Sequence, residues 1–320
     1  MIGKAPMLNG ICVAKVGASH LRDSKPLQDS AKVLLKKGYS IFSVADGHGG
    51  EKYFRSQYGS QIAVMIAEKE FSALLQKIAQ LSGEKSQINW DLTISNLERN
   101  IVAKWKRAVK NHFKKMPLTE TEKDLCKSLN IPLEKFDYIN GKKEVDTLSD
   151  AQKLESPENT IEKLYGTTLI SCLYIPELLL TKENKCSLWI ALQIGDGMCL
   201  AKKQTGEIFS PIPEDKRLGF GVTTSLCSSN AANEFRHAYG FCKLQYICAC
   251  SDGVQDSYTP DGLKSFTNDI YENIKTYGVE REQQELEDFF PRLSEKGSGD
   301  DVSLAGVFLS NGEEKCQIEK

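Results

Sequence analysis

Two spacings of apolar residues divide the chain into helical and strand-like parts. Apolar side chains recur every three or four residues from Glu51 to about Gln80 and again from Asn89 to Phe113, which predicts two long helices with one buried face each. Two further helices are predicted over 261–277 and 281–290. Short runs rich in β-branched and aromatic residues predict strands. These runs cover residues 10–17, 34–35, 39–45, 166–175, 187–194, 198–203, 243–250 and 302–309.

The order of these elements favours one fold class. Strands come first, two long helices follow, and then come more strands, two helices and a last strand. Because helices and strands are segregated, we expect an α+β fold with packed antiparallel sheets rather than alternating βαβ units. Residues 18–26 are predicted to form a loop, and Thr119 with Glu122 a helix capping box. Residues 130–155 are polar, and we expect them to form a surface insertion.

Composition and charge narrow the classes of protein. The chain has 320 residues, enough for one large domain or two modest ones. Its 40% hydrophobic and 26% charged content excludes a mostly disordered chain or a coiled-coil rod. A net charge of −2 argues against nucleic-acid binding driven by the overall charge of the protein. No run approaches the ~20 apolar residues that span a membrane, and the ten cysteines form no C-x-x-C pair. We therefore expect reduced thiols in a cytoplasmic protein.

Five aspartates occupy positions that favour metal binding. Three of them, Asp46, Asp196 and Asp252, stand where an apolar run ends, and each is followed by glycine. Asp300 stands just before an apolar run, and Asp29 lies where a loop enters a strand. Carboxylates at strand ends can converge on one rim of a sheet, where cations must offset their charge. Oxygen ligands of this kind select Mg²⁺ or Mn²⁺.

An isolated Asp-Gly pair is mostly a turn signal. The run Asp-Gly-His-Gly-Gly from Asp46 to Gly50 is a more specific indication of function. Average residue usage makes this run of five a chance event in about one such chain in ten thousand. His48 would lie beside the carboxylates as an acid or base poised near neutral pH. The other three histidines, His20, His112 and His237, have no such context, and we expect the latter two at the surface.

Six motifs resemble, in order, those of the metal-dependent protein phosphatases, the type 2C or PPM family. They are Gln28-Asp29, Asp46-Gly-His-Gly-Gly50, Gly166-Thr-Thr168, Gly195-Asp-Gly197, Ser251-Asp-Gly253 and Gly299-Asp-Asp-Val-Ser303. The resemblance runs from Gly10 to Leu309 and implies one catalytic domain over residues 1–320, with the insertion at 130–155. The implied architecture is a four-layer αββα sandwich, in which helix pairs flank two antiparallel sheets. Gln-Asp in the first motif and Thr223–Leu226 are similar to a divergent bacterial-type branch.

Position by position, the resemblance implies a ligand set for two Mg²⁺ or Mn²⁺ ions. Asp46 would bridge the two ions, and the carbonyl of Gly47 would bind the second. Asp252 and Asp300 would hold the first, and Asp29 would orient a metal-bound water. The implied reaction is direct attack on a phosphomonoester by a water that bridges the two metals.

The resemblance also implies roles outside these two ions. Asp196 would face a weaker third metal position, and His48 would protonate the leaving serine or threonine oxygen. The implied activity is that of a protein serine/threonine phosphatase. Its partners would be phosphoserine and phosphothreonine proteins and a cognate kinase, without nucleic acid or membrane. A nucleic-acid-processing enzyme is the weaker interpretation, because the basic residues over 104–110 fit one solvated helix face.

Departures from the family pattern leave a second function open. Gln28 stands where the family usually has glutamate, so the second metal site would lose a negative charge. Ser24 stands where many members have an arginine that grips phosphate, which leaves Arg22 as the candidate for that role. The alternative function is therefore a pseudophosphatase that binds phosphoproteins or regulates them without efficient turnover.

Overall fold

The strands assemble into two antiparallel sheets of five strands each, within a computed structural model that describes residues 7–80, 88–136, 157–179, 185–215 and 223–310. The first sheet has the order β1 (Met7–Lys15), β10 (Val302–Ser310), β9 (Leu244–Cys250), β6 (Met198–Lys203) and β7 (Ile208–Phe209). The second has the order β2 (Ser30–Lys36), β3 (Tyr39–Ala45), β4 (Leu169–Leu179), β5 (Lys185–Ile194) and β8 (Arg236–Gly240). The first strand pairs with the last, β1 with β10, which brings the two ends of the described chain together.

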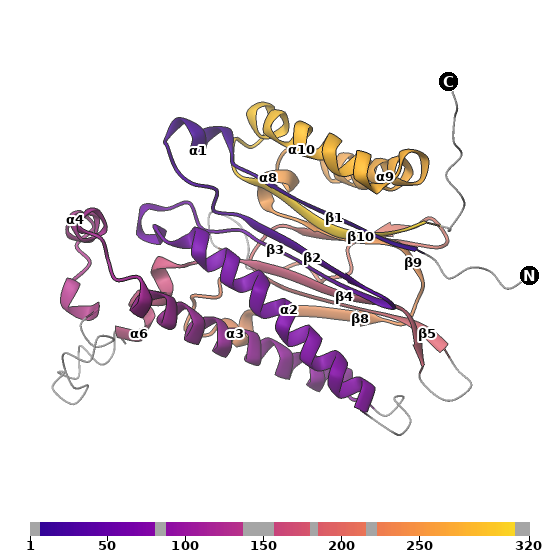
Figure 1. Cartoon of the computed structure of the whole chain (residues 1–320), viewed down its shortest axis with the longest axis horizontal. Coiled ribbons are helices and arrows are strands. Elements are labelled where there is room, and N and C mark those ends of the chain that lie inside the picture. The colour runs from indigo at the N-terminus through magenta and orange to yellow at the C-terminus, as the bar shows by residue number, and fades with distance from the viewer. Residues whose placement is uncertain (1–6, 81–87, 137–156, 180–184, 216–222, 311–320) are drawn as a thin grey trace, which may run out of the picture.

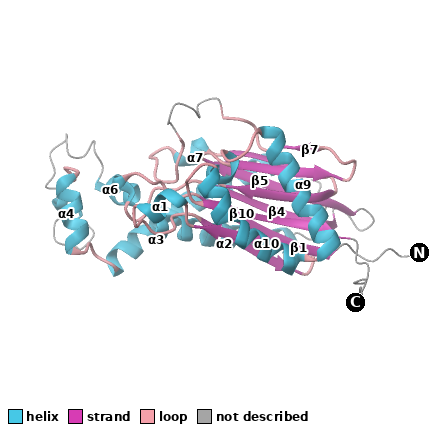
Figure 2. Cartoon of the chain, turned by 90° about the horizontal axis from the view of Figure 1, so that it is seen from above, coloured by secondary structure: helices cyan, strands magenta, loops and turns pink. Residues whose placement is uncertain are grey.

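Helix pairs cover the outer faces of the two sheets. The long helices α2 (Ser56–Gln80) and α3 (Trp90–Lys115) lie on the second sheet, and α9 (Pro260–Tyr277) and α10 (Val279–Lys296) lie on the first (Figures 1 and 2). Shorter helices occupy the connections: α1 (Ala18–Arg22), α4 (Glu120–Ser128), α6 (Pro157–Leu164), α7 (Ala231–Glu234), α8 (Asp252–Gln255) and the 3₁₀ turns η1 (Glu51–Tyr53) and η3 (Leu133–Phe136). The result is the α+β sandwich of four layers that the sequence predicts.

Three apolar layers hold the sandwich together. On β3, the side chain of Ile41 packs towards α2 and α3, whereas that of its neighbour Phe42 packs between the sheets. This alternation follows from the two-residue period of a strand. The third layer lies between the first sheet and α9 and α10, where Phe308 and Phe290 are fully buried. Because the middle layer joins both sheets, the strand ends that carry the motifs are held in a fixed relation.

Most predicted elements are present, but the short elements α1, α6, α7, α8, β7 and β8 were not predicted, and the bounds of several others differ. The predicted loop contains the five-residue helix α1, which lacks a side-chain cap and an apolar repeat that could have revealed it. Strand β8 was not predicted either, because its side chains are only half buried and it lies at a sheet edge. Helix α10 continues through Pro291 to Lys296, beyond its predicted end at Phe290. The capping box of Thr119 and Glu122 is confirmed.

Part of the predicted polar insertion contributes to the core. Phe136, on η3, is 4% exposed and lies 5.4 Å from the ring of Phe113, measured between centroids. Residues 130–136 therefore contribute one aromatic side chain to the layer that α2 and α3 form. The remainder, residues 137–155, lies outside the described residues. The nine cysteines that the structure describes are all free thiols, and no helix among its described residues is long and apolar enough to cross a membrane.

Candidate metal and phosphate site

The loops at one end of the sandwich enclose a cavity of about 860 Å³ that contains most of the predicted site residues. Asp46 follows β3, Asp196 follows β5, Asp252 begins α8 after β9, and Asp300 precedes β10. Cavity-lining residues are Asp46, His48, Gly49, Lys52, Tyr53, Lys163, Asp196, Thr223, Ser225, Cys227, Ser228, Ser229, Glu234, Asp252 and Asp300. The fold therefore brings four aspartates and a histidine from well-separated motifs to one opening.

Backbone contacts fix the loop that carries Asp46. The carbonyl of Asp46 accepts hydrogen bonds from the Thr168 amide and the Thr167 hydroxyl, both at 2.8 Å. The amide of Asp46 in turn donates to the Thr168 hydroxyl at 3.1 Å. A side chain at Gly47 would place its Cβ 2.5 Å from the carbonyl oxygen of Gln28, so only glycine fits. The third motif thus acts as the structural support of the second.

Asp46, Asp196 and Asp252 form a compact carboxylate cluster. Each offers an oxygen, and these oxygens lie within 4.8 Å of one another, close enough to share a metal ion. Burial and the charges of Asp29 and Asp252 raise the pKa of Asp46 well above its ordinary value. Burial likewise raises the pKa of Asp252, which shares a hydrogen bond with Asp46. Carboxylates this close repel one another unless protons or cations offset their charge.

Asp29 is buried and is not among the described residues that line the cavity. It is 4% exposed and accepts a hydrogen bond of 2.6 Å from the Ser303 hydroxyl. Burial, with the charge of Asp301 as the second cause, raises the pKa of Asp29 to about 8. The charge of Asp29 also contributes to the raised pKa of Asp46.

The imidazole of His48 contacts a buried hydroxyl. Its Nε2 lies 2.8 Å from the Ser225 hydroxyl, whose oxygen also lies 3.0 Å from the Thr167 carbonyl. A Ser225 proton directed to Thr167 would make Nε2 the donor and leave Nδ1 as the basic nitrogen. Burial lowers the pKa of His48 to about 4. The imidazole is therefore neutral at pH 7, and an acid role at this pH requires a nearby anion to raise that pKa.

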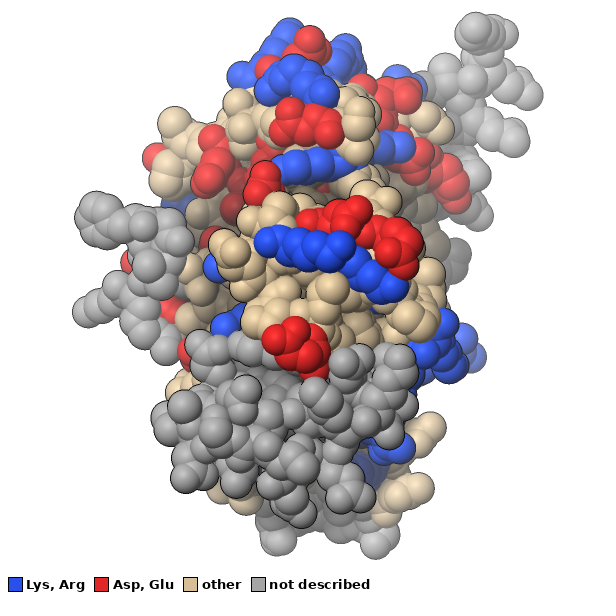
Figure 3. All heavy atoms as spheres, turned by 90° about the vertical axis from the view of Figure 1, so that its left-hand side faces the viewer, with Lys and Arg blue, Asp and Glu red and all other residues tan. Residues whose placement is uncertain are grey.

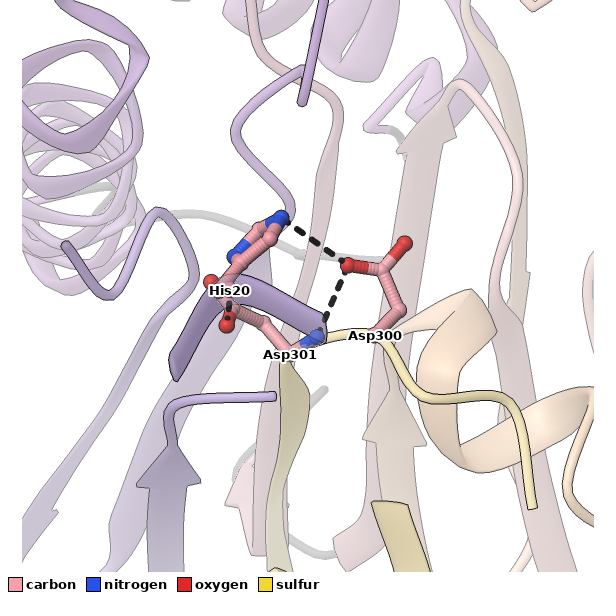
Figure 4. Close-up of side chains that lie close together, drawn as sticks. All are labelled: His20, Asp300 and Asp301. Carbon is pink, nitrogen blue, oxygen red and sulfur yellow. Dashed lines mark hydrogen bonds and ion pairs between the residues drawn. The ribbon is translucent and has the colours of Figure 1, made fainter. Parts of the chain in front are cut away.

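A second acidic cluster joins α1 to the turn before β10. His20 is 6% exposed, and its Nδ1 lies 2.8 Å from Oδ1 of Asp301, whereas its Nε2 lies 3.5 Å from Oδ1 of Asp300 (Figure 4). The hydrogen bond to Asp301 raises the pKa of His20. Sequence reasoning gave His20 no role, because an isolated histidine in a polar segment carries no pattern. It also missed Ser225, which belongs to the Thr223–Leu226 run but matches no catalytic motif.

The other two histidines are not the plain surface residues that we expected. Nδ1 of His112 lies 2.8 Å from the Tyr165 hydroxyl. Nδ1 of His237 lies 2.8 Å from Glu98, a partner on α3 that is far away in sequence. Both side chains are half buried. Neither belongs to the residues that line the cavity.

Arg22 and Gln28 are not among the described residues that line the cavity. Arg22 is exposed at the end of α1 and is not among the described residues that line the cavity, whereas Lys52 and Lys163 are. Gln28 is 5% exposed, and its Nε2 donates to the Ser56 hydroxyl at 2.7 Å. Its Oε1 is buried and has no hydrogen-bond partner among the described residues. A buried acceptor of this kind is costly unless it binds something further.

Comparisons with known proteins agree with this geometry. The family model "Protein phosphatase 2C" matches residues 16–291. PppA, a regulatory component of the type VI secretion system in Pseudomonas aeruginosa, is 14% identical with a TM-score of 0.52, covering 95% of this chain and 98% of its own. A bacterial serine phosphatase is 11% identical with a TM-score of 0.50, covering 96% and 100%.

A third structure is the catalytic domain of the serine/threonine protein phosphatase PstP with two manganese ions. It is 14% identical with a TM-score of 0.48, covering 95% of this chain and 99% of that one. No curated protein sequence matches the chain significantly. At 14% and 11% identity, PppA and the bacterial serine phosphatase show the shared fold alone, whereas the family model matches residues 16–291 of the sequence itself. The motifs, the sandwich and this match together show that the chain belongs to the protein phosphatase 2C family.

Proposed function

We propose that the protein is a protein serine/threonine phosphatase that requires Mg²⁺ or Mn²⁺. The observation that carries the proposal is the convergence of Asp46, Asp196, Asp252 and Asp300 with His48 on one cavity. Phosphate monoesters hydrolyse very slowly without catalysis, so concentrated positive charge is the main requirement of such a site. Membership of the phosphatase family supports the reaction type.

The donor set fits hard divalent cations. All the candidate side-chain ligands are carboxylates, and the raised pKa values of Asp46 and Asp252 reflect charge that protons offset in the metal-free protein. We propose that Asp46, the Gly47 carbonyl, Asp252 and Asp300 hold two ions, and that Asp196 serves a weaker third. When bound, these ions would lower the pKa of a water nucleophile and neutralise phosphoryl oxygens.

The chain's own residues would then bind and orient the reactants. Asp29, which is buried, would orient the attacking water. His48 would present Nδ1 to the leaving oxygen, because Nε2 is held by Ser225. The negative charge of a bound phosphate would raise the low pKa of His48 towards the range in which it can donate a proton. Lys52 and Lys163 on the cavity wall would attract the dianion, in addition to the role predicted for Arg22.

The direct test is hydrolysis of a phosphoserine peptide and of p-nitrophenyl phosphate, with and without Mn²⁺. We expect turnover that depends on Mn²⁺ and is lost in Asp46→Asn and Asp252→Asn. Asp124→Asn provides a matched control, because Asp124 is 71% exposed on α4, outside the residues that line the cavity. Absence of metal-dependent turnover above the level of the two site variants would contradict the proposal.

The buried amide of Gln28 favours the pseudophosphatase as the second candidate, because a neutral residue replaces the family's usual glutamate. Gln28→Glu adds a charge to the site without changing the length of the side chain. If the neutral amide limits metal binding, the variant should bind Mn²⁺ about tenfold more tightly, as measured by titration calorimetry. A wild-type protein that is inactive at saturating Mn²⁺ while Gln28→Glu turns over substrate would favour the pseudophosphatase.

The surface is consistent with a protein substrate. On the face shown in Figure 3, basic and acidic side chains of the described residues are interspersed rather than sorted into one basic field. A uniformly basic surface is the usual electrostatic mark of nucleic-acid binding. We propose that the partners are phosphoproteins and an opposing kinase in the cytoplasm.

A further inference from the structure

A second groove lies between α9 and α10, away from the metal and phosphate site. Its volume is about 460 Å³, and none of its described lining residues also lines the cavity that holds the site aspartates. Its apolar part consists of Phe266 and Ile270 on α9 and Leu286 and Phe289 on α10. Figures 1 and 2 show both helices on the outer face of the first sheet, with no other described element over them. The α9–α10 groove is therefore open to a ligand from outside.

Two aromatic rings of the α9–α10 groove are only partly buried. Phe266 and Phe289 pack against the core under the two helices, yet each remains half buried, with 6.0 Å between the ring centroids. Phe266 also stacks on Tyr258 at 5.0 Å. Apolar surface that stays in contact with water gains free energy when a partner covers it. Aromatic faces in addition attract cationic groups.

The same groove carries an excess of negative charge. Its acidic lining residues are Asp269 on α9 and Glu282, Glu285 and Asp288 on α10. Arg292 is the one basic residue among the described residues that line it. Four carboxyl groups against one guanidinium favour a positively charged occupant.

Glu282 is the buried member of this acidic set. It is 3% exposed, and burial is the main reason why its pKa is raised to about 7. A hydrogen bond with Asn273 lowers that pKa, whereas the charges of Glu285 and Asp269 raise it further. None of these influences comes from a lysine or arginine. A buried carboxyl group without a cationic partner is costly to ionise, and a cation in the groove would reduce that cost.

A metal ion is the competing occupant. At two places in the described chain, at least three histidine, cysteine, aspartate or glutamate side chains bring ligand atoms within 4.8 Å of one another, and neither place is this groove. The carboxylates are instead spread along two helices, next to apolar side chains. This spacing fits an extended ligand that carries positive charge beside apolar groups. An arginine side chain combines both contacts, because its guanidinium pairs with carboxylates and stacks on aromatic rings.

We propose that the α9–α10 groove binds a basic, apolar segment of a partner protein. An arginine or lysine of the segment faces Glu282, and a large apolar side chain covers Phe266 and Phe289. Because the groove shares no described lining residue with the catalytic cavity, the bound partner leaves that cavity open to substrate. The groove is thus a recruitment surface, and its existence does not depend on the proposed phosphatase activity.

The test is selection of short random peptides, displayed on phage, for binding to the whole protein. We expect the selected sequences to combine arginine or lysine with leucine, phenylalanine or tryptophan. A fluorescent copy of a selected peptide then gives the affinity by anisotropy. Glu282→Gln keeps the size of the side chain but removes its charge, and should bind the peptide about tenfold more weakly or worse. Asp288→Lys reverses an exposed charge of the groove and should also weaken binding.

The matched control is Glu70→Gln, which should bind the peptide like wild type. Glu70 is likewise a buried glutamate, 5% exposed, but it lies on α2, which covers the other sheet. Thermal melting by circular dichroism verifies that each variant folds. If Glu282→Gln does not fold, Asp288→Lys alone decides.

Three results would overturn the inference. The first is a selection that yields no binding peptide, or only peptides without basic residues. The second is equal affinity of the peptide for wild type and for the folded groove variants. The third is a wild-type dimer, seen by sedimentation, that Glu282→Gln dissociates, because the occupant would then be a second copy of the chain. An inactive wild-type protein that still binds the peptide would contradict the proposed function and leave this inference standing.

Discussion

Individual carboxylates of the site are destabilising in the metal-free protein. The pKa of Asp46 lies above its ordinary value of 3.8, chiefly because of burial. Relative to the ionised carboxylate, the protonated form of Asp46 stabilises the folded state. This contribution is complete below pH 3.8 and is lost as the pH rises through the raised pKa. An asparagine at this position carries no charge, so we expect Asp46→Asn to melt at a higher temperature than wild type in EDTA at pH 7.5. The difference should shrink at pH 5, as followed by circular dichroism.

The opposite melting behaviour of the Asp46 variant would contradict this argument. If Asp46→Asn melts below wild type in EDTA at both pH values, the carboxylate is stabilising and the argument from burial fails. Asp124→Asn, an exposed control on α4, should melt like wild type at both pH values.

His48 can be tested through the leaving group of the substrate. Alkyl alkoxides need a proton from the enzyme, whereas p-nitrophenolate leaves without one. We expect His48→Ala to lower kcat/KM for a phosphoserine peptide by about 10²-fold or more and to affect p-nitrophenyl phosphate much less. Steady-state kinetics on both substrates gives the ratio. Equal losses would assign His48 to metal-site structure instead of proton transfer.

At the scale of elements, one buried arginine fastens α4 to the start of α2. Arg55 is 3% exposed, and its Nε and Nη2 donate to the two oxygens of Glu122, each at 2.7 Å. Its Nη1 donates to the Met116 carbonyl at 2.7 Å and to the Tyr165 hydroxyl at 3.0 Å. Lysine cannot reproduce this fork. We expect Arg55→Lys to lower the free energy of unfolding by about 2 to 4 kcal/mol, measured by urea denaturation.

An exposed pair provides the control for Arg55. Nε of Arg281 contacts Glu285 at 2.8 Å on the surface of α10, where the two side chains are 61% and 49% exposed. Such pairs contribute little, so Arg281→Lys should leave the unfolding free energy close to that of wild type. Similar losses in the two variants would mean that burial does not set the strength of the Arg55 contacts.

Elements with a strong period were predictable, and those defined by tertiary contacts were not. Helices α2, α3 and α9 show apolar spacing because one face packs on a sheet. Helix α1 has no such face, and its position is set by hydrogen bonds from Ser19 and Gly17 to residues about 280 positions away. The residues of the site show the same difference between those that the sequence pattern predicts and those that tertiary contacts define. Motif aspartates were found from the sequence, whereas His20 and Ser225 depend on contacts that sequence spacing does not encode.

For the whole molecule, the site depends on distant parts of the chain being held together. Asp29 lies near the first strands and Asp300 near the last, and the pairing of β1 with β10 brings these regions together. The formal net charge of −2 at pH 7 counts the site aspartates as ionised. In the metal-free fold some of them keep protons, as the pKa of about 8 for Asp29 indicates. Cation binding at these aspartates is therefore coupled to proton release from them.

This coupling predicts how metal affects global stability. Mn²⁺ at about 100 times its dissociation constant should stabilise the fold by about 2.7 kcal/mol, which corresponds to a rise in melting temperature of roughly 4 °C for a chain of this size. At one fixed Mn²⁺ concentration the rise should be larger at pH 7.5 than at pH 6, because at pH 6 more site carboxyls, including Asp29 with its pKa of about 8, hold protons that the metal must displace. Differential scanning calorimetry measures both shifts. Asp46→Asn should abolish most of the rise. A shift that is equal at the two pH values, or equal in the variant, would mean that Mn²⁺ stabilises the protein somewhere other than at this cluster.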